Sequence, residues 1–357
     1  MRVAAARAAA TRWVAAYARP APGYRGAYFS GSTVGRPGDA ELPPSSDVDV
    51  MVVTEEDDPP AKPGKLRYGG ALLEISYVPW AELRDPEAVL SSYHLAGSFR
   101  SDTVIDDPTG ELRALYADVS PRFAERRWVR RRCLDARRRV EGRLAAFDAS
   151  APFHEQVPAW MFPTGVTTHV LLVAALRNPT VRLRYRAVRD VLIEYGQPEL
   201  YPELLGLLGC AEVSERVVRH HVGELRRTFD ATVPVSRTPF FFSSDLTGPA
   251  RPLAVDGSVE LLDRGEHREA VFWIVATLAR CHTVLAVDDP ALHAARLPAF
   301  EAAVAGLTGI TCTADLLERR ERVLRFLPRL EEATEAVLAA NPDITGQAPL
   351  PPPRACC

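Results

Sequence analysis

Two aspartates on a short apolar segment are the residues best suited to chemistry. Asp47 and Asp49 lie two positions apart in residues 45–53, whose apolar character predicts a β-strand. Side chains of a strand alternate between its faces, so both carboxylates point the same way, roughly 6.6 Å apart along the strand. Carboxylates on one face repel each other. A divalent cation that prefers hard oxygen ligands, such as Mg²⁺, relieves that repulsion.

A third acid and a glycine–serine turn accompany the aspartates. Glu74 lies among the apolar residues of another predicted strand, residues 72–78, where a charge requires a specific role. Gly31 and Ser32 follow an apolar strand that precedes the aspartates in the chain. Three carboxylates and such a turn are the components of a metal-assisted phosphoryl or nucleotidyl transfer site.

The order of these motifs resembles that of the DNA polymerase β superfamily of nucleotidyltransferases. Within it, the chain is most similar to the bacterial antibiotic nucleotidyltransferases, which adenylylate aminoglycosides or lincosamides. The resemblance covers about the first third of the chain. It implies that Gly31 and Ser32 bind nucleotide phosphates and that Asp47 and Asp49 bind Mg²⁺. It also implies that Glu74 is a further metal ligand or the base for an acceptor hydroxyl.

One interval departs from the family pattern. The interval from Gly31 to Asp47 is longer than we expect for the family, and it includes five glycines and prolines after the Gly-Ser turn. These residues break helices, so we expect a shortened helix there, followed by an added loop.

The resemblance also implies a reaction. The expected activity is Mg²⁺-dependent transfer of AMP from ATP to a hydroxyl of a small molecule such as an aminoglycoside, with release of pyrophosphate, and hence a role in antibiotic resistance. Two alternatives stay open: transfer of a nucleotide to a protein or an RNA end, and a non-catalytic nucleotide-binding regulator. Each motif alone also has a structural interpretation, because Asp-x-Asp is often a solvated strand edge and Gly-Ser an ordinary turn. Only their combination favours catalysis.

Composition narrows the class of protein. The 357 residues are 47% apolar and 25% charged, which is typical of a soluble globular protein. The net charge of −3 disfavours nucleic-acid binding over a large surface. A homodimer is compatible with the sequence. Six cysteines without a zinc-like spacing favour the reducing cytoplasm. No uninterrupted apolar run of about 18 residues predicts a membrane helix.

The predicted fold is α+β with two domains. Residues 1–118 form a nucleotidyltransferase domain around a short mixed sheet, residues 119–345 form an α-helical bundle domain, and residues 346–357 form a loose Pro-rich tail. In the first domain we expect a helix over residues 2–19 and a hairpin about Gly69-Gly70. The remaining predicted strands are residues 27–30, 48–53 and a strand and turn at 104–110.

The helical domain offers basic residues for the phosphates. The arginine-rich residues 122–143 are typical of a solvated helix face, or else supply one or two arginines to the triphosphate. Arg182, Arg186 and Arg189 recur at helical spacing and so share one face. Basic residues of related helical domains face the phosphates, so Arg186 is the preferred contact, and a solvated helix face is the alternative interpretation. Residues 232–262 predict a long loop that forms a lid or a wall of the acceptor site. His94 is either a substrate contact or a partly buried structural histidine.

Overall fold

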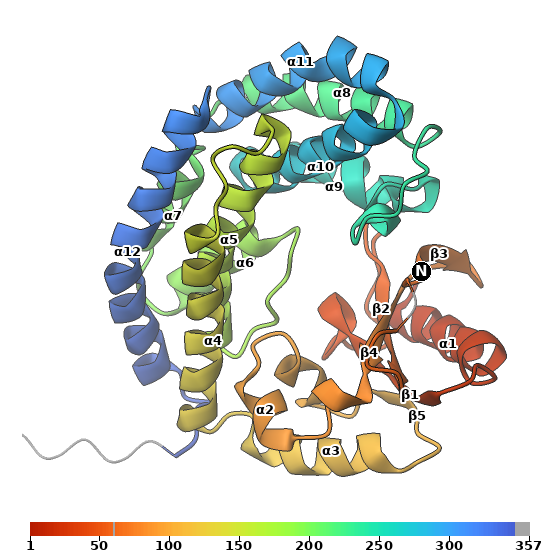
Figure 1. The fold of residues 1–357 in the computed structure, drawn as a ribbon. Helices are drawn as coiled ribbons and strands as arrows, with labels where there is room; N and C mark the ends of the chain where they lie inside the picture. The colour runs from red at the N-terminus through yellow and green to blue at the C-terminus, as the bar shows by residue number, and fades with distance from the viewer. Residues whose placement is uncertain (60, 347–357) are drawn as a thin grey trace, which may run out of the picture.

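The structure is a computed structural model that describes residues 1–59 and 61–346. It has one mixed β-sheet near the N-terminus and a larger, wholly helical part (Figure 1). The predicted α+β class is therefore confirmed. Most of the predicted Pro-rich tail, residues 347–357, lies outside the described residues.

The sheet has five strands in the order β3-β4-β2-β1-β5. Strands β2 and β4 are parallel, and the other neighbouring pairs are antiparallel. The predicted hairpin is confirmed, because β3 and β4 are joined by Gly69 and Gly70, both with positive φ. The strand bounds are β1 Tyr24–Ser30, β2 Val48–Thr54, β3 Gly64–Tyr68, β4 Ala71–Pro79 and β5 Val104–Asp106.

Helices cover both faces of this sheet. Helix α1, Val3–Trp13, continues into a π-helical turn at Val14–Ala18 and packs on the face that carries Val48, Val50 and Ile75. Helices α2, Pro86–Ser91, and α3, Glu111–Val119, pack with Tyr28, Val53 and Val78 of the other face. Side chains alternate between the two faces of β2 and β4. The residues that these helices bury therefore determine which side chains are left to form a site.

The helical part curves past the N-terminal part of the molecule that contains the sheet (Figure 1). Most residues of helices α5 and α10 are buried, and these two helices form the centre of its core. The helix bounds are α4 Arg126–Ala145, α5 Phe153–Ala174, α6 Arg184–Glu194, α7 Leu200–Leu208, α8 Glu215–Thr232, α9 Gly257–Asp263, α10 His267–Asp288, α11 Pro290–Thr308 and α12 Thr313–Ala340.

Two sequence expectations about this part are wrong. Residues 232–262 are not one long loop, because they include short helical turns at Ser243–Asp245, Gly248–Ala250 and Pro252–Asp256, followed by α9. Helix α6 begins only at Arg184, so Arg182 precedes it and does not share a helical face with Arg186 and Arg189.

Three helical stretches of the described residues are long and apolar enough to cross a membrane by length and composition alone. They are Phe153–Ala174, His267–Asp288 and Pro290–Ala340. A search of the sequence for uninterrupted apolar runs indicated none. In the first two stretches, 83% of the most apolar window is buried inside the protein, compared with 39% in the third. Packing in the protein core accounts for the apolar character of the first two.

Candidate functional site

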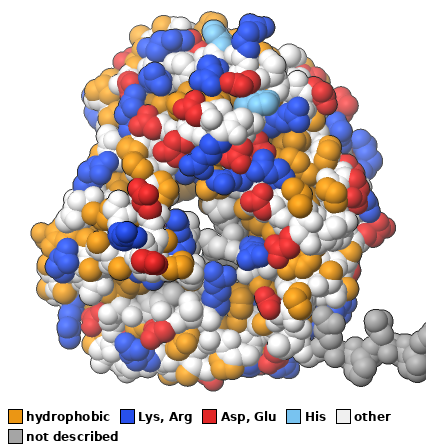
Figure 2. Space-filling view, turned by 180° about the vertical axis from the view of Figure 1, so that it is seen from behind, with side chains coloured by type: hydrophobic (Ala, Val, Ile, Leu, Met, Phe, Trp, Pro, Cys, Tyr) orange, Lys and Arg blue, Asp and Glu red, His pale blue; other side chains and the backbone are white. Residues whose placement is uncertain are grey.

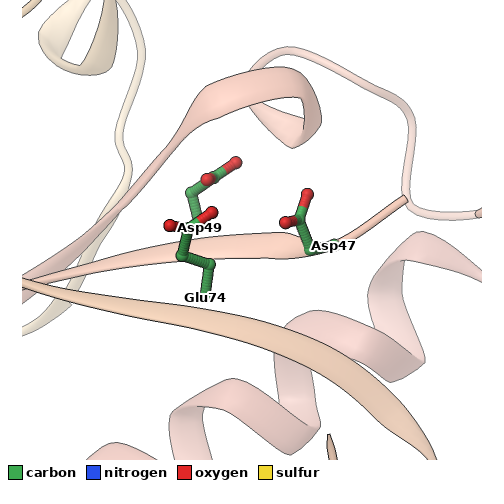
Figure 3. A group of neighbouring side chains, drawn as sticks. All are labelled: Asp47, Asp49 and Glu74. Atoms are coloured by element: carbon green, nitrogen blue, oxygen red, sulfur yellow. The ribbon is translucent and has the colours of Figure 1, made fainter. Parts of the chain in front are cut away.

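The three predicted acids converge at the edge of the sheet that faces the helical part. Asp47 immediately precedes β2, Asp49 lies on β2, and the parallel register places Glu74 of β4 beside Asp49. One carboxylate oxygen from each acid lies within 4.8 Å of those of the other two. Figure 3 shows the three side chains gathered on one side of the strands. This all-oxygen donor set could hold a metal ion that prefers oxygen ligands.

Gly31 closes the acid cluster from the side of β1. It begins a short 3₁₀ turn, Gly31–Thr33, directly after β1 and has a φ of +66°. A Cβ atom at this position would lie 1.7 Å from Oδ2 of Asp49. Only glycine fits here, because any side chain would meet the carboxylate and strain the backbone. The Gly-Ser turn is therefore part of the same site as the aspartates.

Two lysines balance the charge of Glu74. Nζ of Lys62 lies 2.8 Å from Oε1 of Glu74, and Nζ of Lys65, on β3, donates to Oε2. Burial acts to raise the pKa of Glu74, but the two ammonium groups hold it below its ordinary value. Among the described residues no lysine is hydrogen-bonded to Asp49, and burial together with the charges of Asp47 and Glu74 raises its pKa well above the ordinary value.

A buried chain of charges links the acid cluster to the helical part. Nζ of Lys65 lies 2.8 Å from Oδ1 of Asp245, whose Oδ2 accepts from Nη1 of Arg280 at 2.7 Å. Lys65 also lies 3.4 Å from Asp47. Burial acts to lower the pKa of Lys65, but Asp245, Glu74 and Asp47 raise it above its ordinary value. The ammonium group is therefore ionised at neutral pH.

Lys65, Asp245 and Arg280 were not among the site residues predicted from the sequence. Lys65 had one usable signal, because it lies in the predicted β3–β4 hairpin at the position that pairs with Glu74. Asp245 and Arg280 are far from the acids along the chain and gave no local signal. Residues 232–262 were expected to form a lid or a wall of the acceptor site. Asp245 of this segment does lie beside the acids, although the segment is partly helical.

A cavity of about 440 Å³ is lined by the three acids, Lys65, Asp245 and Arg280. We call it the acidic cavity. Its walls include the Gly31-Ser32 turn, the three acids and His94 from the sheet domain. Asn178, Thr180 and Arg182 close it from the helical part. A volume of this size is within the range of sites for nucleotide-sized ligands.

Arg182, rather than Arg186, reaches the acidic cavity. Nη2 of Arg182 donates to the carbonyl oxygen of Ser45, and burial lowers its pKa below the ordinary value. Arg186 lies 3.3 Å from Glu266 and is not among the cavity walls, while Arg189 pairs with Glu266 and Glu269. Of these three arginines, the one that contacts the cavity is therefore Arg182, which precedes helix α6.

The arginines of α4 have mainly structural partners. Arg130 pairs with Glu335 of α12, and Arg137 pairs with Glu331 of the same helix. Arg132 is 2% exposed and donates to the carbonyl oxygens of Leu90 and Phe123. In the described residues none of the α4 arginines is a wall of the acidic cavity.

The comparisons with known proteins add no relatives. No protein-family model matches the chain, and no curated protein sequence matches it.

Proposed function

We propose that this protein is a Mg²⁺-dependent nucleotidyltransferase that moves a nucleoside monophosphate, AMP from ATP by resemblance, to a hydroxyl of a small acceptor with release of pyrophosphate. The observation that carries the proposal is the convergence of Asp47, Asp49 and Glu74 within 4.8 Å, against a turn that only glycine can make. A cluster of acids that served only the fold would not require a glycine in contact with one of its carboxylates.

Each residue has a chemical role in this proposal. Asp47 and Asp49 would hold Mg²⁺, with Glu74 as a further ligand or as the group that accepts the proton of the acceptor hydroxyl. When bound, the metal supplies positive charge that neutralises phosphate oxygens. Backbone N–H groups of the Gly31–Thr33 turn would donate to a phosphate, and Arg182 would pair with another phosphate oxygen from the opposite wall.

The test is transfer of label from α-labelled ATP in the presence of Mg²⁺. Acceptors would include aminoglycosides, lincosamides, RNA and protein. The double variant Asp47→Asn/Asp49→Asn should lose transfer, whereas Asp57→Asn, which changes an exposed acid just after β2, should retain it.

Three outcomes are informative. Label on a small molecule that disappears in the double variant supports the proposal. Label on RNA or protein would move the acceptor to the macromolecular class. Nucleotide binding without transfer to any acceptor would favour a regulator, and transfer that survives the double substitution would refute the assigned metal site.

A further inference from the structure

A second cavity adjoins the acidic cavity and has a different chemical character. It has a volume of about 450 Å³, and its walls come from α4, α5, the start of α6 and residues 241–242. The two cavities share Tyr93, His169, Val181 and Arg280 as wall residues. We call the second one the arginine cavity, because four arginines and, within the described residues, no carboxylate line it.

Arg184 is the most unusual of these arginines. Its side chain is 2% exposed, its Nη1 is buried without a hydrogen-bond partner, and no ion pair joins it to an acid in the described part of the chain. Its Nε donates to the carbonyl oxygen of Val181 at 2.7 Å. Burial lowers the pKa of Arg184 to about 10, so the guanidinium is still charged at neutral pH. A buried charge without a partner is costly and calls for an anion.

The surroundings of Arg184 keep its guanidinium in place. It lies over the ring of Phe272, 3.9 Å from the ring centroid. A Cβ atom at Gly165 of α5 would lie 2.3 Å from Nη1, so the glycine leaves room for this group. Two more arginines at the cavity wall, Arg139 and Arg143, are exposed on α4. Figure 2 shows Lys and Arg side chains around a hollow near the centre of the molecule.

Aromatic rings supply the rest of the wall. Phe162, Phe242 and Tyr93 line the cavity together with Phe241, which is 83% exposed. Phe241 and Phe242 contact each other edge to face, with centroids 5.1 Å apart. Rings and guanidinium planes favour a flat apolar ligand, and an exposed phenylalanine beside a cavity offers surface for such a ligand to cover.

We propose that the arginine cavity binds the acceptor and that this acceptor has a flat apolar or aromatic body with an anionic group, such as a carboxylate. The identification of the ligand as the acceptor depends on the proposed function; the chemical class of the ligand does not. A polycationic aminoglycoside would meet three arginines that have no carboxylate partner in the described residues, together with Arg280. The arrangement therefore disfavours that acceptor.

The first experiment is calorimetric titration of the full chain with naphthalene-2-carboxylate and its neutral isostere, naphthalene-2-carboxamide. We expect the carboxylate to bind at least tenfold more tightly. The preference should disappear in Arg184→Met, which removes the unpaired charge while retaining an apolar side chain of similar length. Equal affinity for the two probes, or a preference unchanged in Arg184→Met, would overturn the proposal.

A second pair of variants guards against misfolding at the buried position. Arg139→Glu reverses a charge at the cavity wall, whereas Arg138→Glu reverses the charge of the adjacent exposed arginine, which does not line the cavity. We expect the first variant to weaken carboxylate binding several-fold and the second to leave it unchanged. Equal effects of both variants would show that only the overall charge of the protein matters, contrary to the proposal.

Two further measurements distinguish a failure of this proposal from a failure of the proposed function. The variant Asp47→Asn/Asp49→Asn should lose Mg²⁺–ATP binding and retain binding of the naphthoate, because its substitutions lie in the other cavity. Displacement of the naphthoate by ATP in direct competition would assign the arginine cavity to the nucleotide and overturn the acceptor assignment. Charge-dependent probe binding without transfer of label to any acceptor would refute the proposed function while the ligand class stands.

Discussion

Replacement of Asp49 by asparagine should stabilise the metal-free protein and abolish its response to Mg²⁺–ATP. Asp49 is partly buried beside Asp47 and Glu74, and within the described residues neither Lys62 nor Lys65 is hydrogen-bonded to it. At neutral pH the carboxylate must either remain ionised against its neighbours or take up a proton, and both cost folding free energy. Asparagine has nearly the same shape and avoids both costs.

The size of the effect follows from linkage between protonation and folding. Each pH unit by which folding raises the pKa of an acid corresponds to about 1.4 kcal/mol of lost stability at pH values above the folded pKa. The upward direction of the shift makes Asp49→Asn stabilising, and we expect it to add about 2 kcal/mol to the free energy of unfolding, as is usual for a poorly compensated buried polar group. For a chain of this size that raises Tm by about 3 °C.

The assay is scanning calorimetry at pH 7.5, first with EDTA and then with MgCl₂ and ATP. In EDTA, Asp49→Asn should melt above the wild type and the exposed control Asp57→Asn should not. With Mg²⁺ and ATP, only the wild type and the control should gain stability, by up to about 3 kcal/mol at a hundredfold excess over Kd. A lower Tm for Asp49→Asn in EDTA would refute the argument that the acids repel each other. An equal gain with Mg²⁺–ATP would refute its role as a ligand.

Three further changes test other parts of the structure. Lys62→Met removes a cation 2.8 Å from Glu74 and should tighten Mg²⁺ binding about tenfold, measured by Mg²⁺ titration of thermal stability; weaker binding would contradict this. Gly31→Ala should destabilise the protein by at least about 2 kcal/mol in urea unfolding, because the added Cβ would lie 1.7 Å from Asp49; an unchanged midpoint would contradict that close approach. His282 is fully buried, and burial lowers its pKa to about 3, so the unfolded state binds its proton more readily. Stability should therefore be lost as pH falls from about 6.5 towards 3, by on the order of 3 kcal/mol at pH 4, and His282→Phe should flatten this dependence of the urea midpoint on pH.

The acid cluster was accessible from sequence because it rests on short-range rules. The two-residue period of a strand puts Asp47 and Asp49 on one face, and the hairpin signal at Gly69-Gly70 fixes where β4 begins. Once β4 lies beside β2, Glu74 must come near the aspartates. The close contact between Gly31 and Asp49 was not derivable, because the path of residues 31–47 between them depends on tertiary packing.

The helical part was harder to predict for a physical reason. Pro158 and Pro163 lie inside α5, where proline removes backbone hydrogen bonds and weakens the sequence signal for one continuous helix. Burial of the surrounding apolar residues stabilises the helix in spite of them. Helix α11 begins at Pro290, and Asp289-Pro290 is a signal both for a turn and for the start of a helix, so local sequence does not distinguish the two. Helical spacing alone likewise misplaced Arg182, which contacts the cavity because α6 has not yet begun.

The charges of the acidic cavity indicate how a metal ion would bind. Four carboxylates and four cations line it, namely Asp47, Asp49, Glu74, Asp245, Arg36, Lys65, Arg182 and Arg280. Lys62 adds a further positive charge on Glu74. A bare divalent ion would leave a clear excess of positive charge, whereas Mg²⁺ with a nucleoside triphosphate is a net anion and brings the cavity close to balance. Because coupling between two ligands is reciprocal, the nucleotide should strengthen Mg²⁺ binding as much as Mg²⁺ strengthens nucleotide binding. The lysines and arginines thus favour a metal–polyphosphate complex over the metal alone.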